Sequence, residues 1–153
     1  QGQVGTVTFG GNVITPTSAT ITGVTGTGLV GTATASGTGG LTIAATYTIT
    51  VVSTAYGNKY AINGSQQATV SLTEGSTFRF DQSDSSNSGH PLRFSTTSDG
   101  THGGGSQYTT GVTTSGTPGS SGAYTQITVA SGAPTLYYYC TNHSGMGGQA
   151  NTP

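Results

Sequence analysis

The chain has 153 residues, enough for one domain or for one domain with a small companion, and threonine, glycine and serine make up about half of it. Only seven residues are charged, and the three basic ones are too few for the cluster that binds nucleic acid, so we expect no nucleic-acid partner. No apolar run approaches the roughly 18 residues of a transmembrane helix, which predicts no membrane insertion. Threonine, valine, isoleucine and tyrosine dominate the remaining residues and suit pleated sheets, so the composition predicts an all-β protein.

The first third of the chain has the pattern of short strands separated by glycine clusters. The clearest strand is Leu41–Val52, in which apolar and polar residues alternate for twelve positions, as in a half-buried strand. One face of this strand collects Leu41, Ile43, Ala45, Tyr47, Ile49 and Val51. Earlier strands are predicted over residues 4–9, 12–24 and 29–35.

The composition changes around Ser53–Asn58, where charged and aromatic residues appear, and we place a domain boundary there. Residues 1–54 are predicted to form a small Gly/Thr-rich β module or assembly arm, and residues 55–153 a β-sandwich of roughly seven or eight short strands. Its strand candidates are 59–63, 68–73, 77–81, 92–96, 123–129 and 135–140.

Two further features of the second part concern its turns and its long insert. Gly75 is a turn position that lets Val70 and Leu72 face the same core as Phe78 and Phe80. The segment Ser98–Ser121 is rich in glycine, serine and threonine, and we expect it to be mostly loop, anchored by Tyr108 and Val112.

The segment after residue 135 concentrates side chains that bind soft metals. Cys140 is the only cysteine, which excludes an internal disulfide, and the only methionine, Met146, follows six residues later with His143 between them. Two histidines and one cysteine in a trigonal set, with a distant methionine, form the ligand field of a blue-copper centre. The spacing predicts that a short loop after a strand brings Cys140, His143 and Met146 to one point, with a second histidine from elsewhere.

Two histidines could complete this set. His90 opens a strand fifty residues before Cys140, whereas His102 lies in a glycine-rich loop. A ligand anchored on a strand is held more rigidly, so we choose His90 and expect His102 to be a solvated loop residue.

The segment from about residue 55 to 148 resembles a cupredoxin domain of the plastocyanin and amicyanin family. Residues 68–80 are similar to the strand, glycine turn and strand that lead to the family's first copper ligand, and His90-Pro-Leu-Arg-Phe94 matches its His-x-x-x-Phe pattern. The C-terminal segment matches the short Cys-x2-His-x2-Met loop of amicyanins. The resemblance implies a Greek-key β-sandwich with a type 1 copper site, whose ligands would be His90, Cys140, His143 and Met146. Strand parity then predicts that Leu136 and Tyr138 face the core and that Tyr137 and Tyr139 face outward.

The motifs around His90 and Cys140 also resemble cupredoxin-like modules of virion and surface proteins of marine phages and bacteria. This resemblance implies a structural subunit of a virion or an extracellular assembly, such as a decoration, fibre or filament. Its partners would be copies of itself or other structural subunits. The alternative is a soluble blue-copper electron-transfer protein, in which case a periplasmic location is the alternative to an extracellular one.

The remaining polar residues give no catalytic pattern. A nucleophile elbow, a carboxylate pair and a phosphate loop are all missing from the sequence, so we expect no enzyme. Asp81, Asp84 and Asp99 are predicted to cap turns rather than to bind calcium. The three basic residues, Lys59, Arg79 and Arg93, are predicted to be exposed strand positions.

Overall fold

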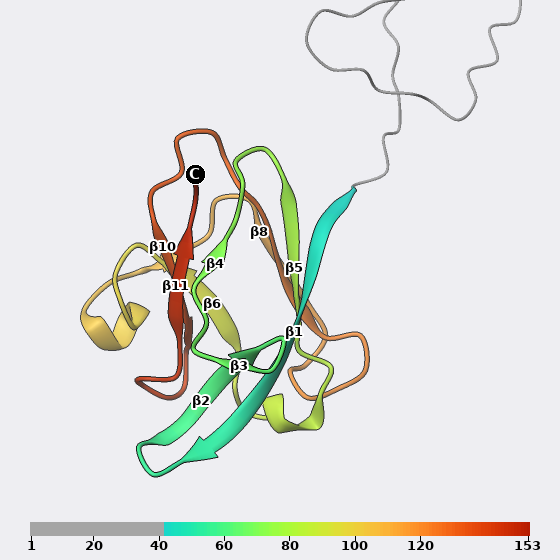
Figure 1. Ribbon diagram of the computed structural model, residues 1–153, viewed down its shortest axis with the longest axis vertical. Coiled ribbons are helices and arrows are strands. Elements are labelled where there is room, and N and C mark those ends of the chain that lie inside the picture. Colours follow the sequence, from blue (N-terminus) through green and yellow to red (C-terminus); the bar gives the residue numbers. More distant parts are fainter. Residues whose placement is uncertain (1–41) are drawn as a thin grey trace, which may run out of the picture. The chain divides into compact units, whose positions relative to one another are not determined.

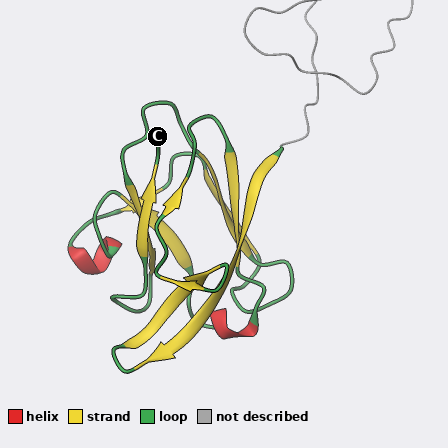
Figure 2. Cartoon of the chain, in the orientation of Figure 1, coloured by secondary structure: helices red, strands yellow, loops and turns green. Residues whose placement is uncertain are grey.

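A computed structural model describes residues 42–153 (Figure 1). These residues form two β-sheets and two short 3₁₀ helices, which confirms the predicted all-β fold (Figure 2). The strands predicted over residues 4–9, 12–24 and 29–35 lie outside the described residues. Within residues 42–153 no helix is long and apolar enough to cross a lipid bilayer.

The larger sheet has six strands in the order β3-β2-β1-β5-β9-β8. It is a mixed sheet, because β1 is antiparallel to β2 but parallel to β5. The strands are β1 (Ile43–Thr54), β2 (Gly57–Ile62), β3 (Ser65–Gln66), β5 (Thr77–Asp81), β8 (Val112–Ser115) and β9 (Tyr124–Thr128).

The smaller sheet has five strands in the order β4-β11-β10-β6-β7 and carries β10, the strand that ends at Cys140. Its strands are β4 (Val70–Ser71), β6 (Leu92–Ser95), β7 (Gln107–Tyr108), β10 (Leu136–Cys140) and β11 (Gly148–Asn151). The 3₁₀ helices η1 (Ser85–Asn87) and η2 (Gly100–Gly103) lie in the connections on either side of β6.

The two sheets pack face to face around aromatic side chains. The ring of Phe80 on β5 meets the ring of Phe94 on β6 edge-on, with centroids 5.1 Å apart, and it also lies 6.5 Å from Tyr138 on β10. Tyr60 on β2 packs against Tyr138 from the larger sheet as well. Because these contacts join residues of opposite sheets, the fold is a β-sandwich. Its Greek-key connection remains a prediction. The arrangement predicted around Gly75 is confirmed, since one core contains Val70, Leu72, Phe78 and Phe80.

Strand β1 corrects the predicted domain boundary. The sequence assigned residues 41–54 to an N-terminal module, but β1 lies between β2 and β5 in the larger sheet. Its predicted alternation is confirmed, because Ile49 is buried and Tyr47 packs on the core, with its ring 5.1 Å from that of Phe80. The change in composition near residue 54 marks the exposed tip of the β1–β2 hairpin, where Tyr56 is 89% exposed. A turn, not a boundary, interrupts the apolar pattern there.

The insert Ser98–Ser121 is mostly loop, as predicted, but it contains η2, β7 and β8. Tyr108 and Val112 pack against the core as its anchors. In all, ten strands, β2 to β11, lie after residue 55, more than the seven or eight predicted. Three of the ten have only two residues each, too few for a periodic pattern in the sequence.

Tyr139 corrects the parity prediction for β10. Leu136 and Tyr138 face the core as predicted, but Tyr139 on the other face is also fully buried. Helix η2 covers it: a Cβ atom added to Gly100 would lie 2.5 Å from the Tyr139 ring carbons, so only glycine fits against that ring. The hydroxyl group of Tyr139 has no hydrogen-bond partner among the described residues, whereas that of Tyr138 donates to the Ala68 carbonyl over 2.7 Å.

Removal of the hydroxyl group from these neighbouring tyrosines is expected to have opposite effects. Tyr139→Phe should raise the free energy of unfolding by about 1 kcal/mol, because a buried hydroxyl without a partner costs desolvation energy. Tyr138→Phe should lower the free energy of unfolding by about 1 kcal/mol, because this substitution removes the hydrogen bond to the Ala68 carbonyl. Urea unfolding of both variants measures the difference. Equal changes in the free energy of unfolding of both variants would contradict the conclusion that only the Tyr138 hydroxyl has a hydrogen-bond partner.

Candidate metal centre

The pairing of β6 with β10 brings His90 next to the end of β10. Cys140 pairs with Leu92 in this ladder, and the Thr141 N–H donates to the Pro91 carbonyl one step further along. His90 lies two residues before β6, so it lies beside the cysteine although fifty residues separate them. After Cys140 the chain turns through the ligand loop, residues 141–147, and returns as β11.

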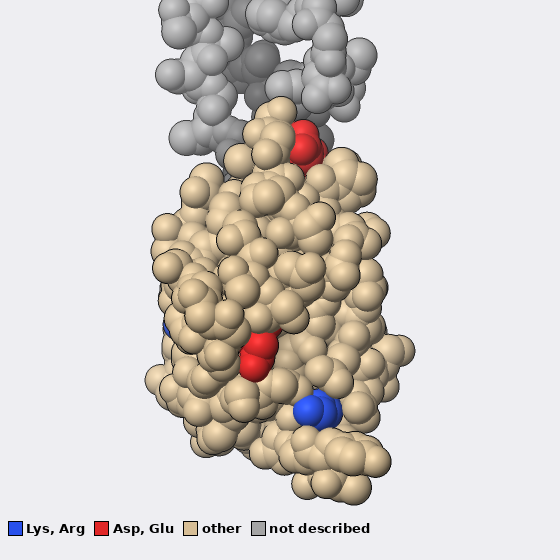
Figure 3. All heavy atoms as spheres, turned by 90° about the vertical axis from the view of Figure 1, so that its left-hand side faces the viewer, with Lys and Arg blue, Asp and Glu red and all other residues tan. Residues whose placement is uncertain are grey.

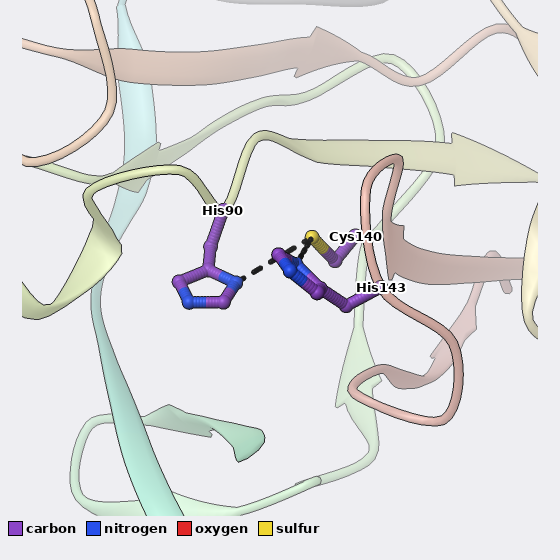
Figure 4. A group of neighbouring side chains, drawn as sticks. All are labelled: His90, Cys140 and His143. Atoms are coloured by element: carbon purple, nitrogen blue, oxygen red, sulfur yellow. Dashed lines mark hydrogen bonds between the residues drawn. The ribbon is translucent and has the colours of Figure 1, made fainter. Parts of the chain in front are cut away.

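Three of the predicted ligand side chains meet at one point. Nδ1 of His90 lies 3.8 Å from Sγ of Cys140, and Nδ1 of His143 lies 3.7 Å from the same sulfur (Figure 4). The two imidazole rings approach each other to 4.6 Å between centroids. The predicted convergence of His90, Cys140 and His143 is confirmed, and His90 rather than His102 is the second histidine of the group.

The separations of these donor atoms fit a single metal ion. For bonds of about 2.3 Å to sulfur and about 2.0 Å to nitrogen at a trigonal angle, the sulfur and nitrogen atoms lie about 3.7 Å apart. The observed distances, 3.7 and 3.8 Å, match this value. A thiol is only a weak hydrogen-bond donor and its sulfur only a weak acceptor, so hydrogen bonds alone would hold the two imidazoles weakly. The arrangement therefore suits metal ligation better than a hydrogen-bonded trio.

The burial of Cys140 and His90 favours metal binding by this group. Cys140 is fully buried and His90 is 9% exposed, whereas His143 is exposed. Burial, and after it the nearby His143, lower the pKa of His90 below its ordinary value. A lowered pKa favours the neutral imidazole, which is the form that binds metals.

Met146 and His102 both lie near the group. Met146 is almost fully buried, and it lines an open concavity of about 590 Å³ together with His102 and His143. Its role as the fourth ligand remains a prediction. His102 is exposed, as expected, but its Nε2 lies 3.0 Å from the carbonyl oxygen of Cys140, a contact that the sequence does not reveal.

A buried polar network holds the backbone of His90. The hydroxyl group of Tyr60 and the side-chain amide of Gln82 both donate to the His90 carbonyl, over 2.7 and 2.8 Å. The Gln82 amide oxygen accepts from the Leu92 N–H, and Asn87 ties the network to Ile49 of β1. Burial, and after it the proximity of Cys140, raise the pKa of Tyr60, so its hydroxyl stays protonated and continues to donate.

The acidic residues Asp81 and Asp84 have the predicted role, but the burial of the basic residues differs from the prediction. Asp81 and Asp84 cap turns as expected, by accepting from the N–H groups of Ser83 and Ser86. The prediction of exposed strand positions is wrong for all three basic residues, which are half-buried and hydrogen-bonded, because long side chains can cover a sheet with their stems. Arg79 binds Gln126, Arg93 binds the Leu92 carbonyl, and Lys59 binds the Gly145 carbonyl.

Comparison with models of known protein families and with curated protein sequences finds no match for this chain. The donor atoms and their geometry therefore carry the functional conclusion.

Proposed function

We propose that this chain is a copper-binding structural protein with a type 1 site formed by His90, Cys140 and His143, with Met146 as a weak axial ligand. The observation that carries the proposal is the pair of sulfur–nitrogen distances, 3.7 and 3.8 Å, to one buried thiol. Two imidazoles and one thiolate in a trigonal set favour copper, and the same set occurs in the cupredoxin family that the sequence motifs resemble. When bound, copper supplies one-electron redox chemistry and a strong link between its ligands.

The surface supports a role in an assembly. Figure 3 shows a face on which few charged side chains interrupt an otherwise uncharged surface. Net charge keeps soluble proteins apart, and this chain has a net charge of only −1. Such a surface suits contacts with copies of the chain or with other structural subunits, in a virion or an extracellular assembly. In this setting the metal links the ligand loop to the segment that bears His90, so its binding energy contributes to folding.

A soluble electron-transfer protein is the second candidate. His143 is exposed and lines the open concavity, which brings the edge of one ligand within reach of a redox partner. Against this candidate, fast electron carriers use charged docking surfaces to steer their partners, and the chain has few charges for that purpose.

Titration of the full chain with Cu(II) tests the site. We expect one equivalent to bind and to produce an intense visible absorption from charge transfer between the thiolate of Cys140 and copper. A chain that gains no such absorption, even with Cys140 reduced, would overturn the proposal.

Sedimentation and voltammetry of the copper-loaded chain distinguish the two candidates. A structural subunit should form oligomers whose size increases with protein concentration. An electron carrier should stay monomeric and show a reversible one-electron wave.

A further inference from the structure

Gly145 lies between the two C-terminal members of the proposed ligand set, His143 and Met146, and two charged side chains hold it. The Nζ of Lys59 donates to its carbonyl oxygen over 2.6 Å. The Oδ1 of Asp99 accepts from its N–H over 2.8 Å. Two of the chain's seven charged residues therefore hold a single glycine.

The two side chains come from separate parts of the fold. Lys59 belongs to β2 of the larger sheet, and Asp99 directly precedes η2, in the insert that follows β6 of the smaller sheet. The adjoining peptide groups are held from β2 and its neighbourhood as well: the Tyr60 N–H donates to the Met146 carbonyl, and the side-chain amide of Gln67 donates to the Gly147 carbonyl. The ligand loop is thus fixed from both sides by the protein alone.

Both peptide groups that flank the Cα atom of Gly145 are held by charge-assisted hydrogen bonds, which are stronger than neutral ones. Glycine is the residue with the greatest backbone freedom, and Gly145 has a left-handed φ of 68°. Fixing both peptide groups removes the rotation that would change the distance between His143 and Met146. The two hydrogen bonds therefore restrain Gly145, the residue with the greatest backbone freedom between His143 and Met146.

We propose that Lys59 and Asp99 are positioning residues of the metal site, which hold Gly145 so that His143 and Met146 keep a fixed separation. This inference rests on the proposed copper site. In such centres the axial ligand tunes the redox potential, so a fixed position of Met146 fixes that property too.

The variant Asp99→Gly tests the inference with little risk to the fold. Asp99 has a left-handed φ of 58°, which glycine adopts readily, so the substitution removes the carboxylate without backbone strain. Lys59→Met is the second variant and keeps an unbranched side chain of similar length. Glu74→Gln is the matched control, because Glu74 also accepts from a backbone N–H, that of Gly132. Its turn between β4 and β5 lies at the opposite end of the sandwich from the ligand loop (Figure 1).

Two measurements report on the constraint. In the metal-free chain, Asp99→Gly should speed hydrogen exchange of the Gly145 amide by about 10-fold, as expected for the loss of a hydrogen bond to a charged group. In the copper-loaded chain, both variants should lose copper to a chelator about 10-fold faster, with a changed ratio of the charge-transfer bands. Glu74→Gln should leave both measurements at their wild-type values.

The outcomes separate this inference from the proposed function. Wild-type amide exchange in the metal-free Asp99→Gly chain, together with wild-type copper loss and spectrum in its copper-loaded form, would overturn the positioning role and leave the copper site standing. A wild-type chain that binds no copper would overturn the proposed function, and the positioning role with it.

Discussion

Substitution of Cys140 by serine is expected to abolish the visible absorption of the copper-loaded chain and to eliminate its stabilisation by copper. The thiol is fully buried, and the Nδ1 atoms of His90 and His143 are both directed at it. Cys140 is the only cysteine of the chain, so no other side chain can supply a thiolate ligand. Copper at 100 times its dissociation constant should raise the free energy of unfolding of the wild-type chain by about 2.7 kcal/mol. The serine variant should show no such increase. Thermal unfolding with copper, and again with a chelator, measures both values.

The change caused by copper, rather than the absolute stability, is the quantity to compare. Serine in place of a buried thiol also places a hydroxyl group in the core, which lowers stability with or without metal. His102→Gln is the matched control: His102 lies outside the ligand group, so this variant should keep the full increase. Equal melting temperatures of the wild-type chain with and without copper would show that the metal does not clamp the ligand loop.

The longer strands could be predicted from the sequence because their signal is local. Alternation of apolar and polar residues gave Thr77–Asp81 with both ends correct, and a run of aromatic residues placed Leu136–Cys140 within one residue. Strand β11 has no such signal in Gly148–Asn151, since it is defined by its pairing with β10 and β4. The burial of Tyr139 escaped prediction for the same reason. It depends on η2, which lies in an insert without periodicity.

The proposed ligand group could be predicted because its residue types are rare in this chain and one of them, His90, lies two residues before a predicted strand. The hydrogen bonds that hold this group in place could not be predicted. The bond from Lys59 to Gly145 spans 86 positions, and that from Tyr60 to His90 spans 30, so only the folded structure brings these partners together. Gln82 looks like an ordinary polar residue after a strand, yet it is almost fully buried. Hydrogen bonds between distant segments leave no pattern in a single sequence.

Substitution of Gln82 by leucine is expected to lower the free energy of unfolding by about 3 kcal/mol. Leucine fills a similar volume but leaves the Leu92 N–H without its acceptor and the Asn87 side-chain oxygen without its donor. Each buried polar group left without a partner costs about 1–3 kcal/mol. Urea unfolding measures the change. Gln66→Leu, at an exposed position of β3, is the control and should stay within about 0.5 kcal/mol of the wild type.

A double variant shows whether Gln82 acts through His90. The His90 carbonyl has two donors, Tyr60 and Gln82, so either single substitution leaves it one hydrogen bond. In the combination of Tyr60→Phe with Gln82→Leu it loses both donors, and the loss of stability should exceed the sum of the single effects by about 1 kcal/mol. Strict additivity would mean that the two side chains stabilise the fold independently. In that case the carbonyl of His90 is not the point at which the network supports the candidate metal centre.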